Sequence, residues 1–341
     1  MKAVVVHGAD DLRIDDIPTP VCGPDDVLVA MEWGGICGSD ISYWKKAVSG
    51  TAVMREPLVL GHEVAGHVAE VGENVTGVEV GARVTIHPAT YVGDHSMPED
   101  MADRINLWPE VRYFGSAAFM PHENGGFSAY RVVRPDQLRY LPDGVSTKFG
   151  ALAEPFGVAL HAVNRAGDVA GKTVLVNGCG PIGALAVAAA KAKGAAKVYA
   201  SDLSPAALEI ARQLGADEVV NIAAGDSLPQ DVEIGIEASG APKALGGVIA
   251  AIRRGGILVQ VGNLPGGESS STLGNIVTRE IEYRGAYRFV DEISEAVELM
   301  NGKVDLSPIM THEYGIDEAQ AAFETAADRS TGSSKVMIKL A

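Results

Sequence analysis

The chain has 341 residues, of which 47% are apolar and 40 are glycine, and its formal net charge at pH 7 is −16. This length predicts about two domains with a sizeable core, and the many glycines predict tight turns and close backbone approaches. The negative charge disfavours nucleic acid and anionic membrane surfaces as partners. Its simplest interpretation is a solvated acidic surface.

The three cysteines, Cys22, Cys37 and Cys179, lie far apart in the sequence. An odd and widely spaced set is not typical of a disulfide framework and fits a reducing compartment. The N-terminus has no apolar run of signal-peptide length, and no apolar stretch is long enough to span a membrane. We therefore expect a cytoplasmic protein without a membrane partner.

Short runs with strand character, separated by glycine and proline, make up the first 150 residues. They include residues 27–31, 63–71 and 81–85. Short strands at this spacing predict a barrel-like β domain.

The middle of the chain changes to alternating strands and helices. Strand-like runs occur at 173–176, 198–200, 232–238 and 257–261, and helical stretches at 182–193, 205–215 and 241–252. This alternation predicts a doubly wound parallel sheet.

After residue 290, helical stretches at 294–300 and 316–327 precede a lone strand at 336–340. We expect that strand to join a sheet of the N-terminal part. The predicted organisation is therefore a catalytic domain of residues 1–150 and 290–341, and a dinucleotide-binding domain of residues 151–289.

A glycine-rich loop, residues 178–183 with the sequence Gly-Cys-Gly-Pro-Ile-Gly, follows the predicted strand 173–176 and opens a predicted helix. In such a loop Gly178 makes the turn, Gly180 lets a pyrophosphate approach the backbone, and Gly183 lets helix and strand pack closely. The helix N-terminus adds N–H donors and a positive dipole end. The alternative interpretation is a purely structural turn.

Asp202 follows the glycine-rich loop at about the 20-residue distance of a ribose-binding carboxylate. It would accept hydrogen bonds from the adenosine ribose and repel a 2′-phosphate, which favours NAD over NADP. A cap for the helix that begins at Ser204-Pro205 is the alternative role. The other predicted cofactor contacts are Pro181, Ile182, Ser239, Val261 and Gly262.

Two short motifs bring a thiol, an imidazole and a carboxylate close together in the sequence. Residues 35–40 read Gly-Ile-Cys-Gly-Ser-Asp and residues 61–66 read Gly-His-Glu-Val-Ala-Gly. Sulfur, nitrogen and one oxygen donor suit Zn²⁺. A free thiol such as Cys37 is more often a core residue, and His62 and Glu63 would point to opposite faces of a strand unless the chain bends there.

These motifs resemble those of the zinc-containing medium-chain dehydrogenase/reductase family over essentially the whole chain. Cys37-Gly38-Ser39-Asp40 is similar to the loop of the family's first ligand. Residues 61–66, with Gly72 and Val75, are similar to its zinc signature. Ala153-Glu154-Pro155 is similar to a third metal-proximal segment, in which glutamate marks the polyol dehydrogenase branch and cysteine marks alcohol dehydrogenases.

The resemblance implies a GroES-like β-barrel-type catalytic domain, a Rossmann domain, and zinc bound by Cys37, His62 and Glu63. Glu154 would be a direct or water-mediated ligand, with a surface or helix-start carboxylate as the alternative. Most zinc-containing members also carry four cysteines that bind a structural zinc, whereas residues 87–116 here contain no cysteine. We therefore expect one zinc per chain and disfavour a substitute site. Such a site would draw on His87, Asp94, His95 and Asp100.

The implied reaction is oxidation of a secondary alcohol, with zinc as Lewis acid and NAD as hydride acceptor. Ser39 stands where the family uses a hydroxyl in the proton path, unless it only bonds backbone. Tyr43 and Glu154 would line the alcohol pocket. Several polyol members have histidine at the position of Ser42, so the resemblance does not define which group takes the proton. Arg288 matches an arginine that reaches substrate hydroxyls and suits a carboxylate, with an interdomain salt bridge as the alternative.

The run 112–122, followed by Gly125-Gly126-Phe127, resembles the L-idonate 5-dehydrogenases of this branch. It implies oxidation of L-idonate to 5-keto-D-gluconate. The alternatives are a sorbitol or xylitol dehydrogenase, a zinc-free NADPH-dependent reductase and a catalytically inactive binding protein of the same fold. Cys37, His62, Glu154 and Asp202 disfavour the reductase, and the intact set of metal ligands disfavours the inactive protein. The family also implies a homodimer or homotetramer that pairs near residues 281–285.

Overall fold

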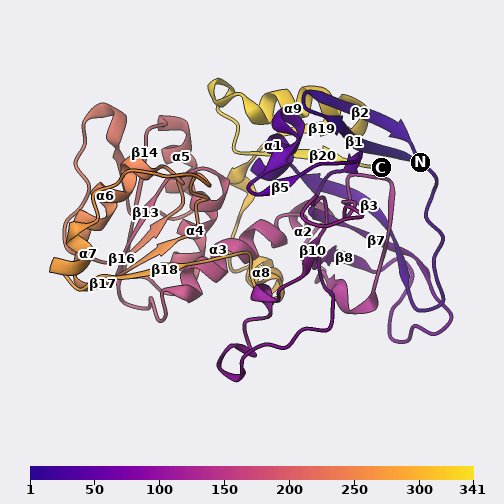
Figure 1. Cartoon of the computed structure of the whole chain (residues 1–341), viewed down its shortest axis with the longest axis horizontal. Helices are drawn as coiled ribbons and strands as arrows, with labels where there is room; N and C mark the ends of the chain where they lie inside the picture. The colour runs from indigo at the N-terminus through magenta and orange to yellow at the C-terminus, as the bar shows by residue number, and fades with distance from the viewer. The chain divides into compact units, whose positions relative to one another are not determined.

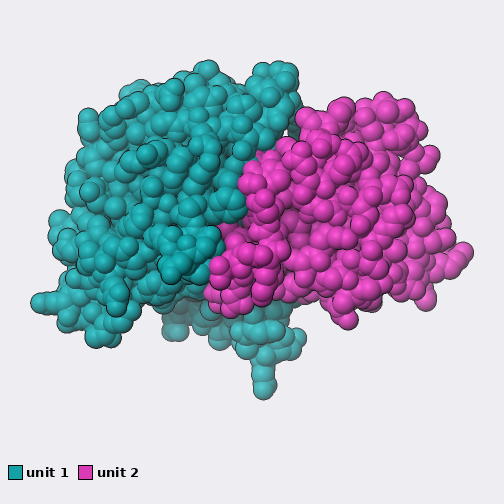
Figure 2. Space-filling model, turned by 180° about the vertical axis from the view of Figure 1, so that it is seen from behind, with its two compact units in different colours: residues 1–154, 310–341 teal, residues 155–309 magenta.

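The computed structural model describes all of residues 1–341, and the chain divides into two compact units (Figure 2). Unit 1 comprises Met1–Glu154 and Met310–Ala341, and unit 2 comprises Pro155–Ile309. None of the helices combines the length and the apolar character needed to cross a membrane.

The chain returns to unit 1 at Met310 and not at the expected residue 290. The cause is helix α8 (Glu292–Met300), which packs within unit 2. A Cβ on Gly157 would lie 3.1 Å from the backbone nitrogen of Ile293, and His161 bonds to Glu292 at 2.8 Å. These contacts keep residues 290–309 in unit 2, whereas the sequence analysis assigned them to the catalytic domain.

A seven-stranded sheet forms the frame of unit 1 (Figure 1), with the order β12-β8-β7-β3-β20-β19 and with β11 also paired to β3. The bounds are β3 Val27–Gly35, β7 Glu63–Val71, β8 Arg83–Ile86, β11 Tyr130–Val133, β12 Leu138–Tyr140, β19 Met310–Gly315 and β20 Lys335–Lys339. The last strand, β20, runs antiparallel to β3 with Met337 opposite Gly35. The expected return of the final strand to the N-terminal part is confirmed.

Smaller sheets and short helices complete unit 1. The sheets are β2-β1-β6, β10-β9 and β4-β5. Their bounds are β1 Lys2–Gly8, β2 Asp11–Asp16, β4 Val48–Ser49, β5 Ala52–Val53, β6 Leu58–Val59, β9 Ala89–Tyr91 and β10 Val111–Tyr113, and the helices are α1 Gly38–Lys46, α2 Thr147–Gly150 and α9 Ala319–Ala327. The fully buried Phe127 and Phe323 meet edge to face in the core, with ring centroids 6.5 Å apart.

Residues 87–116, where a structural zinc would have been held by cysteines, are ordered by apolar packing. Ala89, Val111 and Tyr113 form a buried cluster, and the Trp108 indole N–H donates to the Val92 carbonyl at 2.7 Å. His95 packs against the Trp108 ring. These contacts and the pairing of β9 with β10 hold this segment together.

Unit 2 is a doubly wound α/β domain, as expected. Its six-stranded parallel sheet has the order β15-β14-β13-β16-β17-β18, which is the strand order of dinucleotide-binding folds. The bounds are β13 Thr173–Asn177, β14 Lys197–Asp202, β15 Glu218–Asn221, β16 Val232–Glu237, β17 Ile252–Gln260 and β18 Glu282–Gly285. The other helices are α3 Ala153–Arg165, which starts in unit 1, α4 Pro181–Ala192, α5 Pro205–Gln213, α6 Pro242–Ala251 and α7 Gly274–Thr278.

The pair of His161 and Glu292 stabilises unit 2 in a pH-dependent way. Burial alone raises the pKa of Glu292, but the hydrogen bond and the charge of His161 lower it from 4.5 to about 2. A carboxyl with a depressed pKa in the folded state stabilises the fold above its ordinary pKa. This stabilisation is therefore complete above pH 4.5 and is lost as the pH falls toward about 2.

Replacing Glu292 with glutamine is expected to lower the free energy of unfolding by about 2 kcal/mol near pH 5.5, as for a hydrogen bond to a charged group. The difference from the wild type should vanish as the pH approaches 2. Urea unfolding at several pH values measures it. Glu298→Gln, on the exposed side of the same helix, is the control and should change little. An equal loss at every pH would contradict this account of the pair.

Candidate active site

Cys37 lies where strand β3 gives way to helix α1. It is the residue that caps the helix N-terminus, in an extended conformation. Its backbone N–H donates to the Asp40 carboxylate at 2.9 Å, which satisfies a donor that the first turn of a helix leaves free. The short turn therefore fixes the thiol at the end of a central strand.

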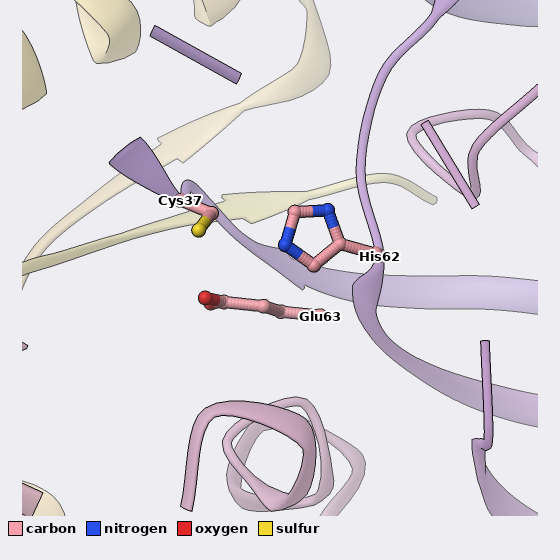
Figure 3. Close-up of side chains that lie close together, drawn as sticks. All are labelled: Cys37, His62 and Glu63. Carbon is pink, nitrogen blue, oxygen red and sulfur yellow. The ribbon is translucent and has the colours of Figure 1, made fainter. Parts of the chain in front are cut away.

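Gly61 allows His62 and Glu63 to face the same space. Its φ of +93° is in the left-handed region, and a Cβ there would lie 2.1 Å from the Phe127 ring, so only glycine fits. Because β7 begins at Glu63, His62 precedes the strand and the alternation of faces does not apply to it. Figure 3 shows the three side chains of Cys37, His62 and Glu63 converging. Their candidate ligand atoms all lie within 4.8 Å of one another.

Asp40 lies behind the His62 ring, fully buried. One carboxylate oxygen accepts from the Gly61 N–H at 3.3 Å and lies 3.8 Å from His62 Nδ1. Carboxylates in this place orient the imidazoles of metal sites. Burial lowers the pKa of His62, but the charges of Cys37 and Asp40 raise it well above its ordinary value. The negative groups around His62 therefore favour positive charge at the imidazole.

Lys335, at the start of β20, holds the Glu63 carboxylate. Its ammonium donates to both carboxylate oxygens at 2.7 Å and to the Ile36 carbonyl at 3.1 Å. Lys335 and Glu63 are each 1% exposed. Burial raises the pKa of Glu63 to about 7, and the charge of Lys335 opposes this rise. A Cβ on Gly35 would lie 2.4 Å from the same carboxylate, so this glycine leaves room for the pair.

Glu154 is buried in the first turn of α3 and accepts a hydrogen bond from the Tyr113 hydroxyl at 2.5 Å. It therefore stands at a helix start but not on the surface. Its carboxylate is not one of the three groups within 4.8 Å, although its charge contributes to raising the pKa of both His62 and Glu63. Glu154 thus lies near Cys37, His62 and Glu63 but is not a member of their cluster.

The remaining predicted catalytic residues are Ser39, Tyr43 and Arg288. Ser39 is half-buried in the first turn of α1. The buried Tyr43 accepts from the Ala117 N–H at 3.0 Å, so its hydroxyl holds the 112–122 run. Arg288 belongs to unit 2, where it has a φ of +51° and stacks its guanidinium over the Tyr287 ring at 4.9 Å.

The glycine-rich loop joins β13 to α4 in unit 2. Gly178 has a φ of +86°, and a Cβ on Gly183 would lie 1.7 Å from the Gly178 carbonyl, so both positions require glycine. Beside Gly180, by contrast, there is open space. Gly180 caps α4 and Pro181 is in its first turn. The loop therefore presents an uncovered helix N-terminus, which suits a phosphate.

Asp202, at the end of β14, bonds to two loops at once. One oxygen accepts from the Cys179 N–H at 2.6 Å and the other from the Ser204 N–H at 2.8 Å. The cap of helix α5 is Ser204 and not Asp202, so Asp202 does not have the capping role considered as an alternative, and its carboxylate links the turn before α5 to the glycine-rich loop. Burial raises the pKa of the Cys179 thiol, which makes it a neutral packing group.

The residues present fit both a metal and a dinucleotide. A half-buried thiol, a buried imidazole and a buried carboxylate, whose ligand atoms lie within 4.8 Å of one another, form a donor set that suits zinc. Open space beside Gly180, at a helix N-terminus, suits a pyrophosphate. Lys335 and Asp40 extend the first of these sites, and the sequence analysis assigned a role to neither of them.

Two family models match the chain. The model of the alcohol dehydrogenase GroES-like domain matches residues 23–143, and the model of the zinc-binding dehydrogenase matches residues 181–302. Sorbitol dehydrogenase of Bacillus subtilis (strain 168) is 35% identical over 347 aligned residues, which cover 99% of this chain and 97% of that protein.

Solved structures agree with the family models. L-idonate 5-dehydrogenase from Escherichia coli superposes with a TM-score of 0.93 and 32% identity, and covers 99% of this chain and 97% of its own. A candidate zinc-binding dehydrogenase from Sinorhizobium meliloti 1021, solved with NADP, has a TM-score of 0.89 and 30% identity, with coverage of 99% and 98%. The chain belongs to the zinc-containing medium-chain dehydrogenase/reductase family, in its polyol dehydrogenase branch, and is a zinc-dependent dehydrogenase of alcohols or polyols.

Proposed function

We propose that this enzyme oxidises L-idonate to 5-keto-D-gluconate with NAD⁺ as acceptor. The observation that carries the reaction class is the converging set of Cys37, His62 and Glu63 in a chain that also has a dinucleotide loop. The sugar-acid substrate is supported by the likeness to L-idonate 5-dehydrogenase, with a TM-score of 0.93. It is also supported by Arg288, whose guanidinium suits a carboxylate.

In this proposal Cys37, His62 and Glu63 hold one zinc ion, and Glu154 is a direct or water-mediated ligand. When bound, zinc supplies Lewis acidity that lowers the pKa of the alcohol hydroxyl. The Asp40 carboxylate, 3.8 Å from His62 Nδ1, attracts positive charge at the ring, and Lys335 keeps Glu63 in place by hydrogen bonds. These supports hold the donors in one geometry before the substrate arrives.

Two transfers complete the proposed reaction. A bound NAD⁺ would accept the hydride from the carbinol carbon, and the hydroxyl proton would leave toward solvent, so that the products would be the ketone and NADH. Ser39 is the proposed first acceptor of that proton, with Glu154 as the other group within the proton path. The hydrogen bond from Tyr113 fixes the orientation of the Glu154 carboxylate. Arg288 binds the carboxylate end of the substrate and Tyr43 supports the pocket wall.

The experiment that tests the substrate compares initial rates of NAD⁺ reduction on L-idonate and on sorbitol with zinc-replete enzyme. We expect the higher kcat/KM on L-idonate, and a selective loss of that preference in Arg288→Ala. A higher kcat/KM on sorbitol would contradict the sugar-acid proposal. It would favour the second candidate, a sorbitol dehydrogenase, which the 35% identity to the Bacillus subtilis enzyme supports.

Asp202 is the proposed determinant of coenzyme choice, with NAD preferred to NADP. Replacing it with serine is expected to raise the KM for NAD⁺ about tenfold, since ribose hydrogen bonds to a charged group are lost. The KM for NADP⁺ should fall in the same variant because repulsion of the 2′-phosphate is removed. Steady-state kinetics with both coenzymes measure the change. An unaltered ratio of the two kcat/KM values would contradict this role.

We further propose that the enzyme is a homodimer or homotetramer that pairs along β18. This strand is at the edge of the unit 2 sheet, and an edge strand offers unpaired backbone groups. The nearby Tyr283 and Val277 are exposed at 40% and 79%. Sedimentation equilibrium should give an even multiple of the 35.5 kDa chain, and a purely monomeric enzyme would contradict the proposal.

A further inference from the structure

A continuous chain of hydrogen bonds crosses the carboxyl edge of the unit 2 sheet. It contains one polar side chain from each of five adjacent strands, β14, β13, β16, β17 and β18 (Figure 1). In spatial order these are Ser201, Asn177, Glu237, Gln260 and Tyr283. Ser201 donates to Asn177 at 2.8 Å, Asn177 to Glu237 at 3.0 Å, Gln260 to Glu237 at 2.5 Å, and Tyr283 to Gln260 at 2.9 Å.

The strand register explains why these side chains meet. Asn177 is paired with Ser201 on one side and with Glu237 on the other, and Glu237 is paired with Gln260. In a parallel sheet, paired residues point to the same face. The first four members therefore form one row, and Tyr283 reaches that row from the edge strand.

Glu237, at the centre of this row of hydrogen-bonded side chains, is a fully buried carboxylate. Its hydrogen bonds come from neutral donors: the amides of Asn177 and Gln260, the backbone N–H groups of Ser239 at 2.9 Å and Gly240 at 3.2 Å, and the Ser239 hydroxyl. Burial of a charge is unfavourable unless it is hydrogen-bonded. The sheet thus places one carboxylate, fully buried and hydrogen-bonded by protein groups, beneath the loops at its carboxyl edge.

The loops that Glu237 holds carry the predicted coenzyme residues. Its side chain bonds to Ser239, and its carbonyl accepts from the N–H groups of Val261 at 3.0 Å and Gly262 at 2.9 Å. Gln260 also donates to the Gly262 carbonyl at 2.6 Å. A Cβ on Gly262 would lie 2.4 Å from the Gly240 nitrogen. The loops after β16 and β17 are therefore fixed against each other with no free space.

At the Ser201 end, the row of hydrogen-bonded side chains reaches the glycine-rich loop. The carbonyl of Ser201 accepts from the Gly178 N–H at 2.8 Å, and the next residue, Asp202, accepts from Cys179. A Cβ on Gly178 would lie 2.5 Å from the Ser239 nitrogen, so the two loops touch directly. One row of side chains thus connects Asp202 and the glycine-rich loop with Ser239, Val261 and Gly262.

We propose that Glu237 is a positioning residue for the dinucleotide. It sets the spacing between the loop expected to hold the pyrophosphate and the loops expected to hold the rest of the coenzyme. This inference rests on the proposed assignment of the coenzyme residues and is independent of which alcohol is oxidised. Since it acts through loop geometry, it should affect NAD⁺ and NADH alike.

The test is Glu237→Gln, which keeps the shape of the side chain but turns one acceptor oxygen into a donor. That donor would face the amide donor of Asn177 or of Gln260, so one hydrogen bond is lost. We expect the Kd values for NAD⁺ and NADH to rise about tenfold, as for one hydrogen bond to a charged group. The KM for coenzyme should rise equally, with kcat, the KM for the alcohol and the zinc content unchanged.

Glu233→Gln is the matched control. Glu233 lies on the same strand, is half-buried, and accepts from the Thr173 N–H at 2.9 Å at the opposite end of the sheet. It should leave coenzyme binding unchanged even if stability falls. Titration of each folded variant with NADH, followed by fluorescence, and with NAD⁺, followed by calorimetry, gives the Kd values without any alcohol present.

Unchanged Kd values in folded Glu237→Gln would overturn the proposal, as would a loss for NAD⁺ without a loss for NADH. If Glu237→Gln does not fold, Gln260→Leu removes one donor to the same carboxylate from a half-buried position. It should raise both Kd values about tenfold, as for one hydrogen bond to a charged group, and unchanged values would overturn the proposal equally. Wild-type protein that binds neither coenzyme would instead overturn the coenzyme assignment on which the inference rests.

Discussion

His62→Ala is expected to abolish alcohol oxidation while the fold is retained. The imidazole is one of three donors within 4.8 Å, and its removal leaves only a thiol and a carboxylate that Lys335 already holds. Loss of the Lewis acid removes about 4 kcal/mol of transition-state stabilisation, which corresponds to about a thousandfold in kcat. Cys37→Ala should have the same effect. The measurements are kcat, zinc content per chain and the thermal unfolding midpoint.

His67→Ala is the control for this prediction. His67 lies on the same strand, β7, is half-buried, and is 3.4 Å from Glu32 and outside the donor set. Its replacement should leave kcat and zinc content near the wild-type values. Normal turnover by His62→Ala with zinc still bound would contradict the assigned metal site.

Lys335→Met is expected to destabilise the metal-free protein by about 3–5 kcal/mol, the range for breaking a buried ion pair. The ammonium donates to both oxygens of Glu63 at 2.7 Å, and both side chains are almost fully buried. Methionine fills a similar volume but leaves the carboxylate without a cation. Urea unfolding of chelator-treated protein measures the loss.

Zinc provides a second test of the same pair. If Glu63 is a metal ligand, saturating zinc should restore part of the stability of Lys335→Met, because the metal neutralises the carboxylate. The double variant Lys335→Met/Glu63→Gln should lose less than Lys335→Met alone, since no unpaired charge remains. Lys2→Met, which breaks an exposed pair with Asp317, is the control and should have little effect. A Lys335→Met protein as stable as the wild type would contradict the account.

Local sequence patterns predicted the dinucleotide half of the molecule well. The strand, the glycine-rich loop and the helix that begins at Pro181 follow one another without a gap. Each part depends on residues close in sequence: a turn at Gly178, proline in the first helical turn, and alanines along the helix. Such signals depend on a few neighbouring residues, so the local structure that they predict does not depend on distant contacts.

The metal half depended on contacts that no local pattern encodes. Lys335 and Glu63 are 272 positions apart, and they meet because β20 and β7 both pair with β3 near Gly35. The direction of His62 depended on the left-handed backbone of Gly61, which the sequence allowed but did not require. Asp40 carried a readable signal, because a carboxylate three residues after a helix cap is typical of a capping box. The boundary near residue 290 was misplaced because tertiary contacts of α8 decide it.

The most direct test of the account is the zinc dependence of NAD⁺ reduction on one secondary alcohol substrate. Enzyme stripped with a chelator is titrated with zinc, and the rate of NADH formation is followed together with the bound metal. The account predicts no turnover without metal and a linear return of activity that ends at about one zinc per chain, as expected for a single catalytic site. Full turnover by the metal-free protein would contradict it.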